Sequence, residues 1–357
     1  MKRMNILISI SHPAWAHQFR HIIDILKKRG HKVQVLVIKK DKNWEVLDQY
    51  GIEYKVIGNT TGKNRLDKSF IFLNSTFKHL LEAIRFKADV LIGRPSPMMS
   101  ITAFLIGKKH IIYSDTERAV EGLFFSKLFS YKILTPMMYR KNLGKKQMRV
   151  ETFKELFYLH PNYFKPNLED LKLVDLKPGE KFSYVRFVAW NASHDLGHRG
   201  FTNEQKMEII KHLEKYGKVI LSSEQDLPEE FDKYIKRIPH NKLHSIMSQA
   251  QLYVGDGLTM AYESNMMGVH SIFPSEMTAG AADELEQKYD LLYAFTDRKK
   301  MVEQTKKKID GLLSKENIRE IGKKKQKRLL QDKKDFNEWW VNYLEEEVAC
   351  RDDFIEC

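Results

Sequence analysis

Short apolar runs alternate with longer amphipathic segments from the N-terminus to about residue 135. The first run is Asn5-Ile-Leu-Ile-Ser9, and the amphipathic segment after it ends at Gly30, a common residue just beyond a helix. Further runs follow at 31–37, 53–57, 89–93, 110–114 and 132–135. Strands that alternate with helices pair in parallel, in a sheet that helices cover on both faces. The sequence therefore predicts an α/β fold with ligand-binding groups beyond the carboxyl ends of the strands.

The alternation stops in the middle of the chain and then starts again. Residues 145–179 lack the periodicity and contain several prolines, which is typical of a connection between domains. Beyond it, strands are expected at 183–188, 218–222, 252–254 and 269–273. The length of 357 residues also suggests two domains. We predict two doubly wound, Rossmann-like domains, at 1–165 and 166–297, followed by a basic helical tail at 298–357.

The cysteine content and the lengths of the apolar runs indicate in which cellular compartment the protein is expected. The two cysteines, Cys350 and Cys357, argue against a disulfide scaffold and fit a reducing compartment. The apolar run near the N-terminus is too short for a signal peptide, and no stretch approaches a membrane span. The sequence predicts a cytoplasmic protein, with the inner face of the membrane as an open alternative.

The formal net charge of +13 favours anionic partners: nucleic acid, lipid headgroups or substrates. Nucleic acid is the weakest of these, because the sequence has no zinc-finger spacing and no RNA-binding aromatic signature. The aromatic residues of the tail are expected to pack onto the body of the protein; a membrane-surface helix is the alternative. Pairing with another copy of the chain also stays open. The aromatic residues are Phe336, Trp339, Trp340 and Tyr343.

The stretch from Leu252 to Glu263 reads as a strand, a glycine-containing turn and the start of a helix. Gly255 and Gly257 would let the backbone turn sharply and approach a ligand. Thr259 is expected to be the N-cap, with Met260 beside it, and a helix start attracts phosphates. Glu263, one turn further on, suits the hydroxyl pair of a sugar. The alternative is an ordinary turn with a solvated Glu263.

Polar residues also follow three strands of the first half. His12, after the first strand, is a candidate general base near neutral pH, or a histidine that caps the turn. Arg94 would bind a phosphate or carboxylate, or form a salt bridge. Asp115 and Glu117 would position a sugar hydroxyl or act as base; as alternatives they would cap the next helix.

The second half has polar loops after its first two strands. His194 and Asp195 lie in one loop, and Ser222, Ser223 and Glu224 form the other. Paired hydroxyls at a strand end can bind a phosphate or the edge of a base. No local spacing suggests a metal site, and no glycine-rich dinucleotide motif follows the first strand. Several polar strand ends aimed at a cleft between two similar domains indicate a ligand site there.

Together these motifs resemble a bacterial and archaeal family described as a domain of unknown function with glycosyltransferase-like architecture. The resemblance spans about residues 1–297. The family is similar to the GT-B group that includes UDP-N-acetylglucosamine 2-epimerase and the peptidoglycan N-acetylglucosaminyltransferase. The motifs are His12-Pro-Ala, Gly93-Arg-Pro, Asp115-Thr-Glu117, Leu159-His-Pro161, Arg186-Phe-Val-x-Trp190 with His194-Asp195, Ser222-Ser-Glu224 and Gly255-x-Gly-x-Thr-Met-Ala-x-Glu263.

The resemblance implies a nucleotide-sugar donor, with UDP as the expected carrier, on the second domain and an acceptor on the first. Gly257 and Thr259 would contact the diphosphate, Glu263 the ribose, and Ser222 and Ser223 the base or phosphates. No cofactor and no divalent metal are implied. Asp256 departs from this scheme unless its carboxylate points away from the phosphate.

Three functions follow from these expectations. The first is a glycosyltransferase that acts on a glycan or lipid-linked acceptor in surface polysaccharide or glycoconjugate synthesis, with His12 or Asp115 as base. The second is a nucleotide-sugar 2-epimerase or hydrolase on the same fold. The third is a binding protein that recognises a nucleotide sugar without turning it over.

Overall fold

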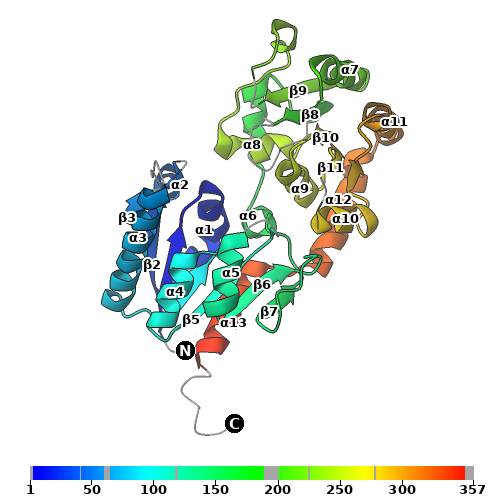
Figure 1. Ribbon diagram of the computed structural model, residues 1–357. Helices are drawn as coiled ribbons and strands as arrows, with labels where there is room; N and C mark the ends of the chain where they lie inside the picture. The colour runs from blue at the N-terminus through cyan, green and yellow to red at the C-terminus, as the bar shows by residue number, and fades with distance from the viewer. Residues whose placement is uncertain are drawn as a thin grey trace. The chain divides into compact units, whose positions relative to one another are not determined.

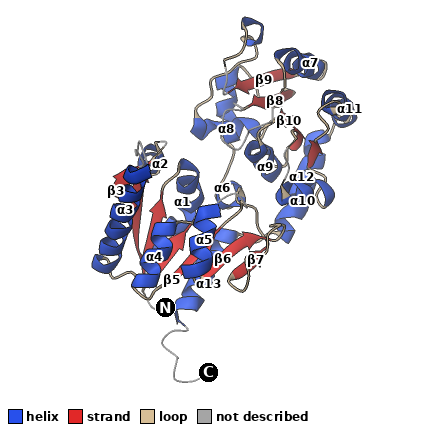
Figure 2. Ribbon diagram, in the orientation of Figure 1, coloured by secondary structure: helices blue, strands red, loops and turns tan. Residues whose placement is uncertain are grey.

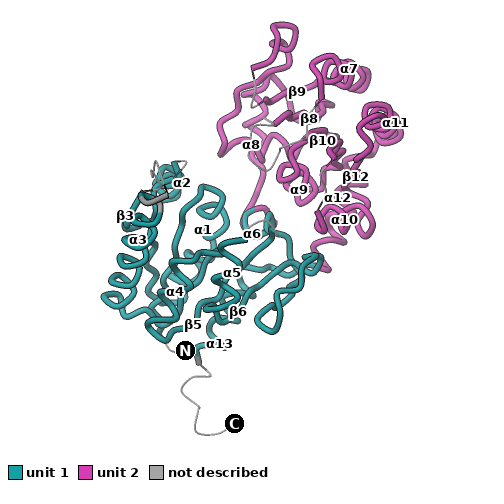
Figure 3. Tube along the Cα trace, in the orientation of Figure 1, with its two compact units in different colours: residues 1–158, 333–357 teal, residues 159–332 magenta. Residues whose placement is uncertain are grey.

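The computed structural model describes residues 3–40, 42–59, 65–116, 120–188, 201–223, 226–276 and 279–349. The chain divides into two compact units (Figure 3). The first unit comprises Met1–Tyr158 and Lys333–Cys357, and the second comprises Leu159–Asp332. In each unit, strands form a central sheet between helices (Figure 2).

The described part of the first unit contains a seven-stranded sheet in the order β3-β2-β1-β4-β5-β6-β7. Every neighbouring pair is parallel, as the alternation of strands and helices predicts. The central strands are buried on both faces and accordingly consist mostly of Ile, Leu and Val. The strands are β1 (Asn5–Ile10), β2 (Lys32–Lys39), β3 (Lys55–Asn59), β4 (Val90–Gly93), β5 (Lys109–Tyr113), β6 (Lys132–Pro136) and β7 (Gln147–Val150).

Helices cover both faces of the first sheet. On one face α3, α4 and α5 lie side by side (Figure 1). The other helix layer contains α1, which contacts both α2 and α13. The bounds are α1 (Pro13–Lys28), α2 (Asn43–Gln49), α3 (Arg65–Arg85), α4 (Pro97–Leu105), α5 (Val120–Phe129), α6 (Leu156–Leu159) and α13 (Phe336–Ala349).

The second unit has a five-stranded parallel sheet among its described residues, in the order β12-β11-β10-β8-β9. Its strands are β8 (Phe182–Phe187), β9 (Lys218–Ser223), β10 (Leu252–Gly255), β11 (His270–Pro274) and β12 (Leu292–Phe295). Its helical elements are η1 (Leu168–Val174), α7 (Asn203–Glu214), η2 (Glu229–Phe231), α8 (His240–Met247), α9 (Leu258–Met266), α10 (Gly280–Gln287), α11 (Met301–Leu313) and α12 (Ile318–Asp332).

The C-terminal helix α13 is part of the first unit. Trp340 is fully buried, with its ring 5.6 Å from that of Phe19 and 6.1 Å from that of Phe157. Glu345 accepts hydrogen bonds from Arg29 and His31. The expectation that the tail aromatics pack onto the body is confirmed. Residues 298–357 do not form one separate tail, because α11 and α12 belong to the second unit. Among the described residues, no helix is both long and apolar enough to cross a membrane.

Replacing Trp340 with Ala should destabilise the first unit by about 3–5 kcal/mol, because it empties a buried aromatic site. Urea unfolding monitored by circular dichroism and tyrosine fluorescence would measure the change. Trp339→Ala is the matched control, since Trp339 is only partly buried and stacks on Phe336 and Tyr343. Equal losses for the two variants would contradict the role given to Trp340.

Candidate functional site

Three of the predicted residues meet at one edge of the first sheet. His12 follows β1, Arg94 follows β4 and Asp115 follows β5, and these strands are neighbours. The strand order reverses between β1 and β4, because β2 and β3 extend the sheet on one side and β4 to β7 on the other. In doubly wound sheets this reversal opens a crevice at the carboxyl ends, where ligands bind. The parallel register therefore brings together residues that are about 100 positions apart.

Asp115 forms ion pairs with both Arg94 and Lys154. Arg94 donates from Nη2 to Oδ1 of Asp115, and Nζ of Lys154 lies 3.1 Å from the other carboxylate oxygen. Lys154 also lies 3.5 Å from Glu155. Arg94 is buried, and its Nε and Nη1 have no hydrogen-bond partner among the described residues. Nη2 thus holds the guanidinium at the strand end, and the N–H groups of Nε and Nη1 make no hydrogen bond among the described residues.

This pairing sets the protonation of Asp115. Burial alone would raise the pKa of its carboxyl group, but the charges of Arg94 and Lys154 hold that pKa well below its ordinary value. The pKa of Lys154 is raised above its ordinary value, because Asp115 and Glu155 outweigh the effect of burial. A carboxylate with both oxygens paired to cations is a weak base. The geometry therefore favours Asp115 as the anchor of Arg94 rather than as a proton acceptor.

His12 is the N-cap of α1. Its Nδ1 accepts a hydrogen bond of 3.2 Å from the backbone N–H of Ala14, the capping role that the sequence left as an alternative. The side chain is exposed. With Nδ1 as an acceptor, the neutral ring carries its proton on Nε2. Nε2 can act as a base only if the ring gives up the cap and the proton moves to Nδ1.

In the second unit, the stretch from Gly255 to Glu263 lies where the strand order of its sheet reverses. β8 lies between β9 and β10, and Gly255 is in register with Arg186 of β8. A side chain at Gly255 would come within 2.5 Å of both the Arg186 carbonyl oxygen and the Tyr253 hydroxyl. Glycine is therefore required at position 255, because these two neighbouring groups leave no space for a side chain. Neither glycine has a positive φ angle, so the short turn from β10 to α9 does not use the left-handed conformation.

The N-cap of α9 is Gly257, which corrects the prediction of Thr259. Thr259 is the second helical residue and is exposed, while Met260 after it is buried. No side chain caps the start of α9. Since the first N–H groups of a helix have no partner within the helix, those of Leu258 and Thr259 remain available to an anion.

The carboxylate of Asp256 is turned toward the end of β8, where it accepts a hydrogen bond of 2.9 Å from the backbone N–H of Val188. This bond ties the loop after β10 to the neighbouring strand. Glu263 is buried one turn along α9, with Oε1 3.2 Å from Nε2 of His244.

Several neighbours of the predicted residues were missed by sequence reasoning. His244 comes from α8 and packs edge-on against Phe164, with ring centres 6.1 Å apart. Arg186 donates from Nη1 to the Ser222 hydroxyl at 3.1 Å. No local motif marks His244 or Phe164, since only the fold brings them close to α9. Ser223 is half-buried at the end of β9 beside Ser222.

Four predicted residues lie outside the described residues: Glu117, His194, Asp195 and Glu224. Within the described ranges, no group of three or more His, Cys, Asp or Glu side chains is arranged to hold a metal ion.

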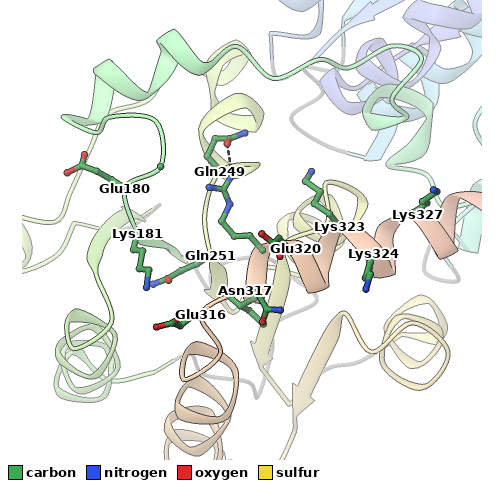
Figure 4. A pocket seen from close by; sticks show the side chains of 13 residues that line it. Glu180, Lys181, Gln249, Gln251, Glu316, Asn317, Glu320, Lys323, Lys324 and Lys327 are labelled. Carbon is green, nitrogen blue, oxygen red and sulfur yellow. Dashed lines mark hydrogen bonds between the residues drawn. The ribbon is translucent and has the colours of Figure 1, made fainter.

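A hollow of about 640 Å³ in the second unit lies at the other edge of its sheet (Figure 4). Residues 179–181 immediately precede β8, and Gln249 and Gln251 precede β10. Arg319 of α12 donates to Gln249 at 2.6 Å. Because these residues line the amino ends of the strands, the hollow is separate from the candidate residues at the carboxyl ends.

Residues 4–335 match the family described as "Protein of unknown function (DUF354)". The chain belongs to this family. The resemblance predicted from the motifs is therefore confirmed, and the match extends past the predicted end at residue 297. No curated protein sequence matches this member of the DUF354 family.

Solved structures of GT-B proteins resemble this DUF354 chain in fold at low identity. The spinosyn forosaminyltransferase SpnP is 11% identical, with a TM-score of 0.66 over 98% of this chain and 100% of its own. The S. aureus MnaA–UDP structure is 13% identical, with a TM-score of 0.65 and 97% of each chain covered. The UDP-GlcNAc 2-epimerase of Neisseria meningitidis, bound to UDP-GlcNAc, is 11% identical, with a TM-score of 0.64 over 89% of this chain and 94% of its own. The predicted GT-B-like fold is confirmed.

Asp115→Asn should destabilise the first unit by about 3–5 kcal/mol at neutral pH, because it leaves Arg94 buried without its counter-charge. Since the pKa of Asp115 is depressed in the folded state, its stabilisation is present above the unfolded pKa of about 4 and is lost as the pH falls below it. The variant should therefore lose less stability than the wild type between about pH 4 and pH 2.

Urea unfolding at a series of pH values would measure both effects. Glu169→Gln is the control, because its ion pair with Lys172 is exposed and worth less than about 1 kcal/mol. A variant with the wild-type pH dependence would show that Asp115 is not the titrating group.

Proposed function

We propose that this protein is a glycosyltransferase that binds a nucleotide-diphosphate sugar on its second unit and moves the sugar to an acceptor hydroxyl. The observation that carries the proposal is the uncapped start of α9 at the reversal of the strand order, beside an exposed Thr259. A helix start with unpaired N–H groups favours a diphosphate. UDP or UDP-GlcNAc in two structures of the same fold supports this choice of ligand and makes UDP the first carrier to test.

In this proposal the diphosphate lies against the N–H groups of Leu258 and Thr259. The helix dipole stabilises the leaving diphosphate, so the proposal includes no divalent metal. Glu263 receives the ribose hydroxyls, which requires its carboxylate to share or exchange the contact with His244. Ser222 and Ser223 at the end of β9 receive the base or a phosphate, with the Ser222 hydroxyl oriented by Arg186.

The acceptor is proposed to bind at the carboxyl edge of the first sheet. Arg94 has two buried nitrogens without partners among the described residues, which suit a phosphate or carboxylate on a glycan or lipid-linked acceptor once the groups that cover them move aside. His12 is the proposed base: the ring releases the N–H of Ala14, the ring proton moves from Nε2 to Nδ1 through solvent, and Nε2 then takes the acceptor proton. The acceptor oxygen attacks the anomeric carbon, and the nucleoside diphosphate leaves with the electron pair of the broken bond.

A nucleotide-sugar 2-epimerase or hydrolase is the second candidate. UDP-GlcNAc 2-epimerases are among the structures of this fold, so the likeness does not separate the two reactions. Binding without turnover is the third candidate. NMR of the nucleotide sugar, incubated alone and with a candidate acceptor, distinguishes them: an epimer, free sugar or a glycosylated product would each identify one reaction.

Binding of UDP should be retained in excess EDTA and should weaken about tenfold or more in Glu263→Gln, because the variant loses a charged acceptor for the ribose hydroxyls. Isothermal titration calorimetry would measure both values. Glu320→Gln, in the hollow at the other edge of the same sheet, is the matched control. If all nucleoside diphosphates fail to bind the wild type at millimolar concentration, the donor site at α9 is wrong.

His12→Ala should lower the turnover rate by about 10²–10⁴ while UDP binding is unchanged. His12→Asn separates catalysis from capping, since Asn caps the helix as His12 does but cannot take up a proton. The proposal expects both variants to be equally slow and His12→Asn to be as stable as the wild type. Full activity in His12→Asn would leave His12 with a capping role alone.

A further inference from the structure

The helix layer formed by α3, α4 and α5 carries an unusual share of exposed apolar side chains. Phe70 of α3 is 71% exposed, Phe104 of α4 is 61% exposed and Phe124 of α5 is 59% exposed. Contiguous apolar surface of this kind marks an interaction site, whereas isolated exposed residues need no explanation. We call this surface the apolar face; its exposed members are Phe70, Leu73, Phe77, Ile84, Phe104, Leu105, Phe124 and Leu128.

Ring contacts join the three helices into one patch. The ring of Phe125 lies 6.3 Å from that of Phe72 on α3 and 5.5 Å from that of Phe124. Phe129 lies 6.3 Å from Phe125 and 5.0 Å from Phe104 on α4. A chain of five phenylalanines therefore runs across the outside of the layer (Figure 1 shows the three helices). The apolar face is continuous over three elements.

The buried side of the same helices contains several polar residues. Ser75 and His79 of α3, Ser100 of α4 and Ser126 of α5 are all buried. Their hydrogen bonds are made inside the unit: His79 bonds Ser9 of β1 at 3.0 Å, and Ser100 lies 3.3 Å from Ser126. These three helices thus carry several buried polar groups inward and large apolar groups outward.

Basic residues border the apolar face at one end. The three helices run in the same direction, and their C-terminal ends carry Arg85 and Lys87, Lys108, and Lys127, respectively. Two acids at this end pair with the row in part: Glu82 lies 3.5 Å from Arg85 and 2.8 Å from Lys55, and Asp89 lies 4.0 Å from Lys108. Four basic residues against two acids still leave this end with a net positive charge. Two other acids, Asp67 and Glu121, stand in the first turns of α3 and α5, at the other end. The charge along this row complements an anionic surface.

We propose that the apolar face is a docking surface for a lipid bilayer with anionic headgroups. Phenylalanine and leucine side chains would enter the boundary between headgroups and acyl chains, and the basic row would meet lipid phosphates. Three helices side by side offer a broad face, which suits a bilayer surface. This proposal goes beyond the sugar-transfer reaction and does not depend on it, because vesicle binding requires no nucleotide.

Flotation of the full chain with vesicles tests the proposal. The protein should float with vesicles of phosphatidylcholine and 30% phosphatidylglycerol, and less with pure phosphatidylcholine or at 500 mM salt. Phe104→Glu with Phe124→Glu should lower the partition coefficient about tenfold or more. The matched control is Leu168→Glu with Leu173→Glu on η1, two similarly exposed leucines of the second unit.

The urea unfolding midpoint of each variant, compared with that of the wild type, shows whether the variant is folded. Phe70→Glu with Leu105→Glu provides a second pair of substitutions on the apolar face. Wild-type flotation in both pairs from the apolar face would overturn the proposal, as would equal losses in the control pair. The absence of flotation with anionic vesicles would also overturn it. So would a wild-type dimer in light scattering that becomes monomeric in the variants, because a second copy of the chain would then cover the face.

Discussion

Parallel strand pairing is the constraint on which the rest of this structure depends. It makes every strand of a unit end at the same edge of the sheet, so loops that are far apart in sequence meet there. In the first unit it brings together His12, Arg94 and Asp115; in the second it sets Gly255 against Arg186. Helices must then cover both faces of each sheet, which assigns inner and outer sides to every helix.

The two candidate sites differ in how far their charges are neutralised by neighbouring side chains. In the first unit, Asp115 is held between Arg94 and Lys154, so most of the local charge is neutralised within the protein. In the second, the start of α9 has no capping side chain, and Asp256 bonds to the neighbouring strand. The first arrangement fixes an arginine in place, and the second leaves a positive helix end for an anion. This difference is the physical basis for assigning the nucleotide diphosphate to the second unit.

The two helix layers of the first unit also differ. On one side, α13 packs Trp340 and Phe336 into an aromatic cluster with Phe19 and Phe157. On the other, α3, α4 and α5 bury serines and a histidine and leave phenylalanines outside. The aromatic tail and the apolar face thus differ in exposure: the side chains of Phe336 and Trp340 are buried, whereas those of Phe70, Phe104 and Phe124 are exposed. The tail aromatics are core, although the sequence patterns of both are apolar and helical.

The sequence by itself determined the α/β class, the two parallel sheets and the family. Hydrophobic periodicity and short motifs depend only on residues that are close together in the sequence, so they can be recognised without a structure. It also placed His12, Arg94, Asp115 and Ser222 at strand ends. Only the tertiary structure decided the N-cap of α9 and the reason for Gly255, which depend on the atoms of β8. The same holds for His244 beside Glu263 and for Lys154 beside Asp115. These contacts join distant parts of the chain, and packing rather than local propensity selects them.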